Sequence, residues 1–177
     1  MHLGVIGGSS LFHSDAFQSM QERIISTFFG DVKFYTQRFG SNEIVFCQRH
    51  HADAIDMDKY TQPGNINFKA IVSAFAQLKV DTILSVYSVG SMDTSLSLGT
   101  LILPDDYFHP FAIQSLSVGY DAHCVPGIDL ILRQQCVDLL VQSGMNPTMG
   151  GTYVQASGPR FETKAEIKFF AQYGVIL

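Results

Sequence analysis

The sequence predicts an α/β fold, and three observations support this prediction. Short apolar runs that stop at glycine or hydroxyl-bearing turns predict buried strands, as at Leu3 to Ile6 and Asp81 to Val86. From Asn65 the apolar residues repeat instead at the spacing of one helical face. The residues on this face are expected in the core, and they are Phe68, Ile71, Val72, Phe75 and Leu78. Strand, helix and strand in this order predict a right-handed crossover between parallel strands.

The same two signals, short apolar runs for strands and helical spacing of apolar residues for helices, predict the remaining elements. Strands are expected at Glu22 to Thr27, Val32 to Phe39, Glu43 to Gln48, Thr100 to Leu103, Thr152 to Gln155 and Val175 to Leu177. Helices are expected over Ile128 to Gln142 and from Thr163 to about Tyr173. No repeat or linker interrupts the sequence, so residues 1–177 are expected to form a single domain. Because the last buried strand lacks a closing element, this domain is expected to be incomplete at its C-terminal end.

Composition argues against several classes of protein. Of the 177 residues, 46% are hydrophobic, which argues against a disordered chain. A net charge of −5 without a basic run argues against a nucleic-acid partner, and no apolar segment is long enough to span a membrane. The cysteines Cys47, Cys124 and Cys136 are odd in number and lack C-x-x-C spacing. A disulfide framework and a zinc site are therefore not expected, and a cytoplasmic location is.

The first candidate site is the turn Gly7-Gly8-Ser9-Ser10, which follows the first strand. Glycines let backbone N–H groups approach an anion, and a hydroxyl adds a donor. The spacing fits neither the G-x-G-x-x-G dinucleotide fingerprint nor a Walker loop. An anion site and a simple tight turn are both compatible with this sequence.

The second candidate is Arg49-His50-His51, which ends a predicted strand. An arginine supplies a forked pair of donors that suits an oxyanion such as phosphate. The alternative is the charged, solvated end of a strand. No third ligand lies nearby at a suitable spacing, so a metal site is not expected. The irregular stretch from His51 to Pro63 is either a lid beside this site or only a loop.

The third candidate is the loop from Gly158 to Glu166, between a strand and a helix. Thr163 and Glu166 have the S/T-x-x-E spacing of a capping box, so the helix is expected to begin there. Phe161 and Glu162 precede it and would offer a stacking face and an acceptor for the N–H groups of a flat heterocycle. The alternative is a plain turn with a solvated glutamate.

Taken in order, these turns resemble those of the trimeric purine nucleoside phosphorylase and methylthioadenosine phosphorylase family. The similar segments are Gly7-Gly8-Ser9, Arg49-His50, Asn65-Ile-Asn-Phe-Lys-Ala, Ser88-Val89-Gly90-Ser91, Pro104-Asp105-Asp106 and Gly158-Pro159-Arg160-Phe161-Glu162-Thr163. The resemblance covers the whole chain but only about the first two-thirds of the family pattern. It implies a three-layer phosphorylase-like fold, in which helices flank a mixed central sheet.

The resemblance also implies a reaction, in which inorganic phosphate attacks the anomeric carbon of a purine nucleoside and releases the base. Phosphate is then a co-substrate, and neither a metal nor a cofactor is required. Ser9, Arg49, His50 and Ser88 match the phosphate positions, and Ser88 lies in the turn that also contacts ribose. Phe161 and Glu162 match the purine-facing pair. Glu162 and His50 are the candidates for catalytic residues.

Three departures from the family pattern bear on the substrate. Tyr87 stands where the methylthioadenosine enzymes often have threonine, which makes it a candidate ribose neighbour. His51 replaces the usual glycine after Arg-His. Glu162 is more typical of 6-oxopurine users, including methylthioinosine phosphorylases, than of 6-aminopurine users. The substrate is therefore expected to be a purine nucleoside or its 5′-methylthio analogue, with a preference for an oxopurine.

The family's Met-containing turn, and its Asp or Asn that meets purine N7, have no counterpart in this sequence. An alternative is therefore a catalytically inactive fragment or binding-only relative that keeps the phosphate and purine contacts. A chance coincidence of turns on an unrelated α/β domain is the remaining alternative. The resemblance also implies a homo-oligomer, either a trimer or a dimer of trimers, in which a neighbouring chain lends a residue to each site. His123 is the candidate for that residue.

Overall fold

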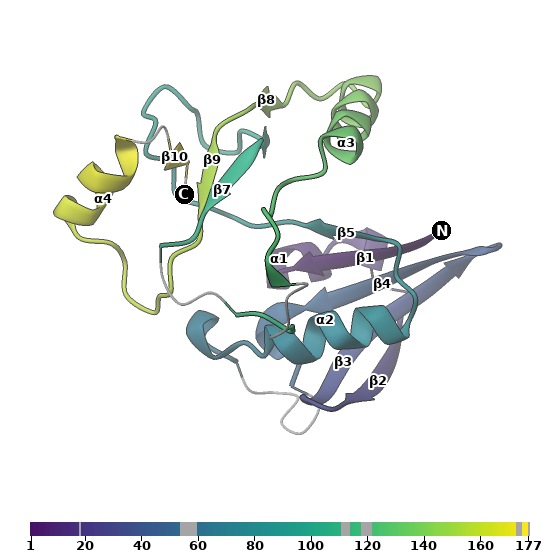
Figure 1. Cartoon of the computed structure of the whole chain (residues 1–177). Helices are drawn as coiled ribbons and strands as arrows, with labels where there is room; N and C mark the ends of the chain where they lie inside the picture. Colours follow the sequence, from purple (N-terminus) through teal and green to yellow (C-terminus); the bar gives the residue numbers. More distant parts are fainter. Residues whose placement is uncertain (18, 54–59, 111–113, 118–121, 173–174, 177) are drawn as a thin grey trace. The chain divides into compact units, whose positions relative to one another are not determined.

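The structure is a computed structural model that describes residues 1–17, 19–53, 60–110, 114–117, 122–172 and 175–176. The chain divides into two compact units, Met1–Ser88 and Val89–Leu177, which we call the first and the second unit (Figure 1). The single domain expected over residues 1–177 stays a prediction. Within the described ranges, no helix is both long enough and apolar enough to cross a membrane.

A five-stranded mixed sheet forms the first unit, in the order β2-β3-β4-β1-β5 (Figure 1). The strands are β1 (His2–Gly7), β2 (Gln21–Thr27), β3 (Gly30–Phe39), β4 (Asn42–Gln48) and β5 (Thr82–Ser85). β2, β3 and β4 are antiparallel neighbours, whereas β1 pairs in parallel with β4 on one side and with β5 on the other. The strands predicted in this part of the chain are confirmed. The chain crosses from β4 to β5 through a helix, and β1 fills the place between them.

Helix α2 (Phe68–Gln77) covers one face of this sheet and follows the 3-10 turn η3 (Pro63–Asn65). Asn67 caps the helix, because its side-chain oxygen accepts the backbone N–H three residues further on at 3.1 Å. Phe75 of α2 packs on Phe34 of β3 with ring centroids 4.9 Å apart, and both side chains are buried. The helical face predicted from Asn65 onward therefore contributes to the main core of the unit.

Aromatic side chains cover the opposite face of the sheet, beside α1 (Ser9–Phe12) and the 3-10 turn η1 (Asp15–Phe17). Side chains alternate along a strand, so Phe46 of β4 points away from α2. Phe12 stacks on Phe46 with centroids 5.7 Å apart, and Phe17 lies 4.6 Å from the same ring. Helical segments therefore lie on both faces of the mixed sheet, and they hold the turn after β1 close to it.

Two predictions of burial in the first unit are wrong. The strand predicted over Asp81 to Val86 forms, but Ile83 and Leu84 are 44% and 41% exposed. β5 is the last strand of its sheet, and β1 is its only partner strand in the described part of the unit. Val72 is 37% exposed because it lies one residue round from Ile71, at the margin of the helical face.

Two small parallel sheets and two helices make up the second unit. One sheet has the order β10-β9-β7, and in the other β6 pairs with β8. The strands are β6 (Ile102–Leu103), β7 (Asp106–Phe108), β8 (Thr148–Met149), β9 (Thr152–Val154) and β10 (Val175–Ile176). The helices are α3 (Leu130–Gln142) and α4 (Lys164–Ala171). Val154 and Phe170 form the buried cluster of this unit.

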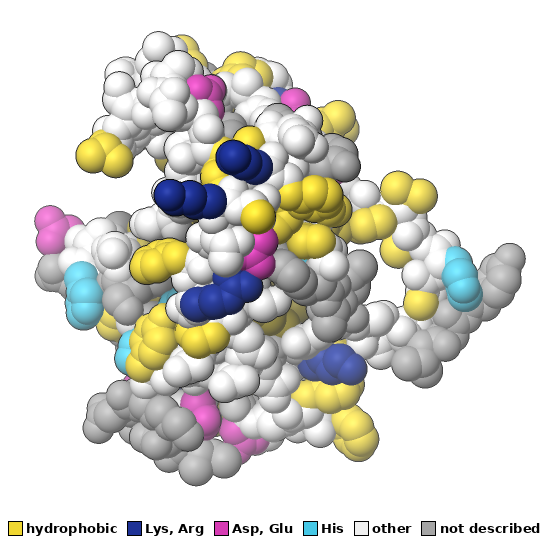
Figure 2. All heavy atoms as spheres, turned by 90° about the vertical axis from the view of Figure 1, so that its left-hand side faces the viewer, with side chains coloured by type: hydrophobic (Ala, Val, Ile, Leu, Met, Phe, Trp, Pro, Cys, Tyr) yellow, Lys and Arg dark blue, Asp and Glu magenta, His cyan; other side chains and the backbone are white. Residues whose placement is uncertain are grey.

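Helix α3 has the predicted position but little burial. It begins after Asp129, whose side chain accepts a hydrogen bond from the N–H of Ile131 at 3.0 Å, and Gly144 follows its end with φ of +79°. Val137 is buried, whereas Ile131 and Val141 are 74% and 56% exposed. Exposed hydrophobic side chains are frequent on the protein, and Figure 2 shows several of them in yellow.

Candidate functional site

The first group of predicted site residues lies at the carboxyl edge of the parallel strands in the first unit. β1 and β4 pair with Gly7 opposite Gln48, so the glycine turn and the 3-10 turn η2 (Arg49–His51) begin side by side. A Cβ built on Gly8 would stand 3.5 Å from Nη1 of Arg49. The guanidinium therefore lies against the backbone of the glycine turn, as the anion-site hypothesis requires.

Arg49 carries a buried donor without an acceptor. Its Nη1 is shielded from solvent, and no described residue accepts a hydrogen bond from it. Its Cζ lies 4.6 Å from the centre of the Tyr87 ring, so an aromatic face covers the guanidinium. Leaving a buried donor unsatisfied costs on the order of 1–3 kcal/mol. An anion bound beside Gly8 would supply the missing acceptor.

Two hydroxyls that were predicted to contact phosphate belong to neighbouring turns. Ser9 is the first residue of α1, and the placement of its side chain lies outside the described part of the structure. Ser88 is exposed and follows β5. Pairing of β5 with β1 continues to Val86, whose N–H donates to the carbonyl of Ile6 at 2.9 Å. The turns after β1, β4 and β5 therefore begin at one edge of one sheet.

His50 is buried and fixed by the chain around Thr61. Its Nδ1 lies 2.9 Å from the carbonyl oxygen of Thr61, and its ring stacks on Tyr60 with centroids 4.8 Å apart. A carbonyl only accepts, so Nδ1 carries the proton in this contact. Burial lowers the pKa of the imidazole below 6.5, although the Thr61 contact opposes this. His50 is therefore neutral at pH 7 and offers Nε2 as a hydrogen-bond acceptor.

The predicted lid over His51 to Pro63 is described only at its two ends. Residues 54–59, which form its middle, lie outside the described ranges. The sequence pattern did not single out Tyr60 or Thr61, yet these residues return to His50 and hold its ring. Alternation of apolar residues gives no signal for such a contact. The contact depends on the path of an irregular loop, which brings Tyr60 and Thr61 back to His50.

The groups that could hold a metal are sparse. In the part of the chain that the structure describes, no cluster of three or more His, Cys, Asp or Glu residues has the geometry of a metal site. The three cysteines are free. Cys47 is fully buried beside the site, and burial raises the pKa of its thiol to about 12, so it stays protonated at neutral pH.

The purine-facing candidates lie in the second unit, on the loop between β9 and α4. Phe161 is 93% exposed, and Glu162 is half-buried. The capping box predicted for this loop is confirmed: the N–H of Glu166 donates to Oγ1 of Thr163 at 3.3 Å, and the N–H of Thr163 donates to Glu166 Oε2 at 2.7 Å. The assignment of Phe161 and Glu162 to a purine stays a prediction.

Arg160 makes contacts in this loop that the sequence pattern did not reveal. Its two terminal nitrogens donate to the two carboxylate oxygens of Glu166, at 2.8 and 2.7 Å. Its Nη1 also donates to the carbonyl oxygen of Phe161 at 3.0 Å. Arg160 therefore ties the residue that carries the exposed aromatic ring to the first turn of α4.

The remaining candidate, His123, is exposed and lies in the second unit. Arg49, His50, Tyr87 and Ser88 belong to the first unit, and Phe161 and Glu162 to the second. The assembly of these two groups, and the role of His123 beside them, stay predictions.

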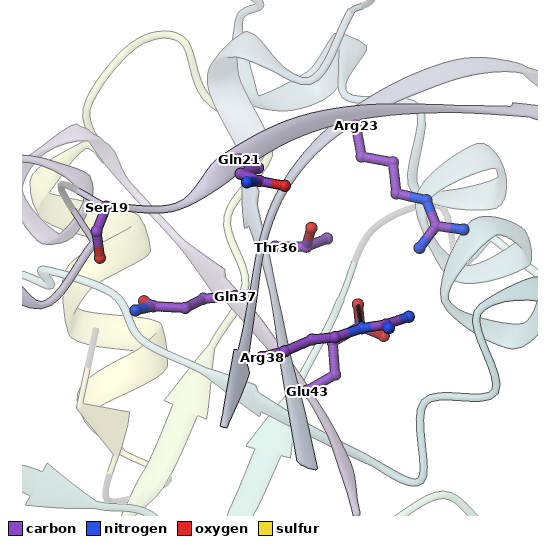
Figure 3. Close-up of a pocket in the computed structure, with 7 residues that line it drawn as sticks. All are labelled: Ser19, Gln21, Arg23, Thr36, Gln37, Arg38 and Glu43. Atoms are coloured by element: carbon purple, nitrogen blue, oxygen red, sulfur yellow. Dashed lines mark ion pairs between the residues drawn. The ribbon is translucent and has the colours of Figure 1, made fainter. Parts of the chain in front are cut away.

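A polar groove of about 520 Å³ lies elsewhere in the first unit (Figure 3). Its lining residues come from β2, β3 and β4 and the chain before β2, and they are Ser19, Gln21, Arg23, Thr36, Gln37, Arg38 and Glu43. Nε of Arg38 lies 3.5 Å from the carboxylate of Glu43. Since none of the predicted site residues lines this groove, it is separate from the Arg49 cluster.

The shielded, unsatisfied Nη1 of Arg49 lies at the strand ends of a mixed sheet, so this end of the sheet is a candidate anion site on an α/β protein. Comparison with protein families makes the assignment specific. The family model described as "Phosphorylase superfamily" matches residues 2–177, and the chain belongs to this family.

Curated relatives agree with this assignment. A protein of Archaeoglobus fulgidus, named probable 6-oxopurine nucleoside phosphorylase, is 30% identical over 172 residues, which are 97% of this chain and 69% of the relative. The S-methyl-5′-thioadenosine phosphorylase of Geobacter sulfurreducens is 28% identical over 181 residues, or 98% of this chain and 62% of that protein. The family resemblance seen in the ordered turns is therefore confirmed, and the chain is a member of a family of nucleoside phosphorylases.

Solved structures confirm the fold. Methylthioadenosine phosphorylase from Schistosoma mansoni in its apo form matches with a TM-score of 0.81 at 20% identity, over 99% of this chain and 71% of that one. The predicted phosphorylase-like α/β fold is thus correct. This chain spans about two-thirds of the length of the proteins that it matches.

Proposed function

We propose that the protein catalyses phosphorolysis of a purine nucleoside or a 5′-methylthio purine nucleoside. Inorganic phosphate would be the co-substrate, and the products would be the free base and ribose 1-phosphate or 5-methylthioribose 1-phosphate. The observation that carries this proposal is the buried, unsatisfied Nη1 of Arg49 beside Gly8. The relatives' names support the reaction class, and this donor supports the assignment of a phosphate site beside Gly8.

In the proposed reaction a phosphate oxygen attacks the anomeric carbon while the bond from this carbon to the purine nitrogen breaks. The electron pair of that bond passes to the purine, which takes up a proton while the new sugar phosphate gives up the proton of its O–H, so the products are the neutral base and a sugar phosphate dianion. Arg49 holds the dianion through charge-assisted hydrogen bonds, together with N–H groups of the glycine turn and the hydroxyls of Ser9 and Ser88. The neutral His50 accepts a hydrogen bond from the phosphate O–H or a ribose hydroxyl, which orients the nucleophile.

The base would be held by Phe161 and Glu162. The ring of Phe161 would stack on the purine, and its 93% exposure leaves it available for such a contact. The Glu162 carboxylate would accept the N1–H that a 6-oxopurine carries and a 6-aminopurine lacks. This hydrogen bond would hold and orient the oxopurine while its bond to the ribose breaks. Glu162 would thus act as a catalytic residue and favour an oxopurine substrate, such as inosine or methylthioinosine.

The reaction as proposed needs neither a metal nor a cofactor, because phosphate itself is the nucleophile. We place it in the cytoplasm, in keeping with three free cysteines. A homo-oligomer, trimeric or a dimer of trimers, would cover part of the exposed apolar surface. His123 is the candidate for the residue that each chain would contribute to the site of its neighbour. Neither nucleic acid nor a membrane is a proposed partner.

The alternative is a chain that binds phosphate and purine without turning nucleosides over. The observations that favour it are the unsatisfied Nη1 of Arg49 and the exposed ring of Phe161, which would serve binding as well as they would serve catalysis. Binding without turnover would leave the Arg49 cluster and the loop at Phe161 in use, but would remove the catalytic role of Glu162.

The test is release of free base by the 177-residue chain from inosine, methylthioinosine and methylthioadenosine, with and without inorganic phosphate. The proposal predicts release that depends on phosphate and yields a sugar 1-phosphate. Binding of phosphate and hypoxanthine without release from any of the three nucleosides would support the alternative. Release that does not depend on phosphate would contradict both.

The substrate preference has its own test in Glu162→Ser. Loss of the carboxylate should lower kcat/KM for methylthioinosine by roughly ten- to a hundredfold, the value of one charge-assisted hydrogen bond. The loss for methylthioadenosine should be smaller, because adenine offers no N1–H. Equal losses on the two nucleosides would remove the reason for preferring an oxopurine.

A further inference from the structure

We propose that Arg160 is a positioning residue for the purine half of the site. Its contacts with Glu166 and with the backbone would fix the conformation in which the loop presents Phe161 and Glu162 to the base. We call the contacts among Arg160, Thr163 and Glu166 the clasp. The inference rests on the proposed function, and it assigns to Arg160 an effect on the affinity for the nucleoside.

The clasp fixes the backbone on both sides of Phe161 and Glu162. On the N-terminal side, Arg160 forms a two-pronged ion pair with the carboxylate of Glu166 at 2.7 and 2.8 Å. On the C-terminal side, the N–H of Thr163 donates to the same carboxylate at 2.7 Å. Phe161 and Glu162 are the only residues between these two anchors, and Arg160 also binds the carbonyl of Phe161.

The clasp also stays charged over the working range of pH. The hydrogen bonds from Arg160, followed by those from Thr163, lower the pKa of the Glu166 carboxyl to about 2. The carboxylate is therefore ionised throughout the neutral range, so the clasp is a fixed support and does not titrate there. The hydrogen bonds to Glu166 and its charge raise the pKa of Arg160, and attraction from Glu162, the side chain that would meet the base, adds to this rise.

The exposure of the Arg160–Glu166 ion pair favours a positioning role over a purely structural one. An exposed ion pair contributes little to global stability, because water and salt screen it. Phe161 is 93% exposed, so packing in a core does not hold this loop. Without the clasp, the two presenting residues would have to be ordered when the nucleoside binds, and binding would bear that entropy cost. The effect should appear in the affinity for the nucleoside and leave the affinity for phosphate unchanged.

The experiment compares Arg160→Ala, Glu166→Ala, the double variant and Arg160→Lys in the full 177-residue chain. Lys168→Ala is the matched control, because Lys168 is an exposed cation of α4, the helix that contains Glu166, and takes no part in the clasp. Removing either partner should raise the nucleoside KM by about tenfold, with the phosphate KM unchanged. The double variant should show no larger effect than either single change, since each opens the same clasp. Lysine cannot form the two-pronged contact and should restore only part of the affinity.

Two results would overturn the proposal. One is an unchanged nucleoside KM in Arg160→Ala together with a lower Tm, which would make the clasp a support of α4 alone. The other is an equal rise of the phosphate and nucleoside KM values, which would indicate a general disturbance of the fold.

A second readout does not depend on turnover. Exchange of the Thr163 amide hydrogen, followed by NMR, should be slow in the wild-type chain and in Lys168→Ala and fast in Arg160→Ala. If the wild-type chain neither releases base nor binds hypoxanthine, the proposed function and its binding-only alternative both fail, and the purine role of Arg160 falls with them. Amide exchange would then still show whether the clasp orders the loop, and unchanged protection in Arg160→Ala would contradict the clasp itself.

Discussion

The two units hold their candidate residues by different means. In the first unit, Phe34, Ile71 and Phe75 belong to an extended buried core, and the turns that carry Arg49 and His50 leave its sheet directly. In the second unit, the buried cluster is Val154 and Phe170, and the loop with Phe161 and Glu162 is held by charged hydrogen bonds. The turns that carry Arg49 and His50 are thus anchored to a packed sheet, whereas the loop with the purine candidates is held by a polar clasp.

This difference has a consequence for function. A donor on a turn anchored to a packed sheet stays in place without its ligand, so the proposed anion site would already be formed in the free protein. A loop held by exposed polar contacts retains more freedom, which would suit the proposed role of admitting and releasing a base. Changes to core residues should therefore alter stability most in the first unit, whereas changes to the clasp should alter affinity more than stability.

The largest expected effect is on stability, in Phe75→Ala. The side chain is 1% exposed and packs on Phe34, so its removal should lower the free energy of unfolding by about 3–5 kcal/mol. Phe170→Ala is the matched change in the second unit and should cost less, because its small cluster can relax around the gap. Urea titration followed by circular dichroism measures both variants. An equal or larger loss in Phe170→Ala would break the comparison between the units.

A smaller effect is expected from Thr163→Ala, which removes the side chain that caps α4. Loss of a cap costs about 1 kcal/mol, and the effect should be local. Hydrogen exchange measured by mass spectrometry should show faster exchange over Lys164–Ala171 and unchanged exchange in α2. Faster exchange throughout the first unit would show that the two units are not independent in stability.

The smallest effect is a pH dependence from His50. Burial lowers its pKa below the value of 6.5 that applies in the unfolded chain, so between these two values the unfolded chain binds more protons. Folding stability should therefore be lost as the pH falls from about 6.5 through the lowered pKa. Tm measured across this range should fall more for the wild-type chain than for His50→Asn, which does not titrate. Parallel curves for the two proteins would contradict the burial of His50.

Local signals in the sequence predicted much of the fold. β2, β3, β4 and α2 follow from apolar periodicity, and the cap at Thr163 follows from the spacing to Glu166. Burial was harder to predict: β5 has an apolar sequence, but its exposure depends on what covers the edge of the sheet. The strand predicted over Thr100 to Leu103 forms as β6, whereas the two-residue strand β8 is too short to show a period and was not predicted.

The candidate site shows the same division. Motif order brought Gly8 and Arg49 into one hypothesis, and the structure places them together. The stacking of Tyr87 on Arg49 and the hold of Thr61 on His50 join residues distant in sequence, which local patterns do not encode. Arg160 lay inside a recognised motif, but its partner became visible only through the geometry of the loop.

The most direct test of the central claim is calorimetric titration of inorganic phosphate into the wild-type chain, Arg49→Ala and Arg23→Ala. Arg23 is an exposed arginine of the same sheet that lines the separate groove, so it controls for loss of positive charge. Arg49→Ala should weaken phosphate binding by roughly ten- to a hundredfold, since charge-assisted hydrogen bonds are lost. Its Tm without phosphate should not fall, because the lost donor is unsatisfied in the free protein. Unchanged phosphate affinity in Arg49→Ala, or an equal loss in Arg23→Ala, would contradict the assignment of the anion site.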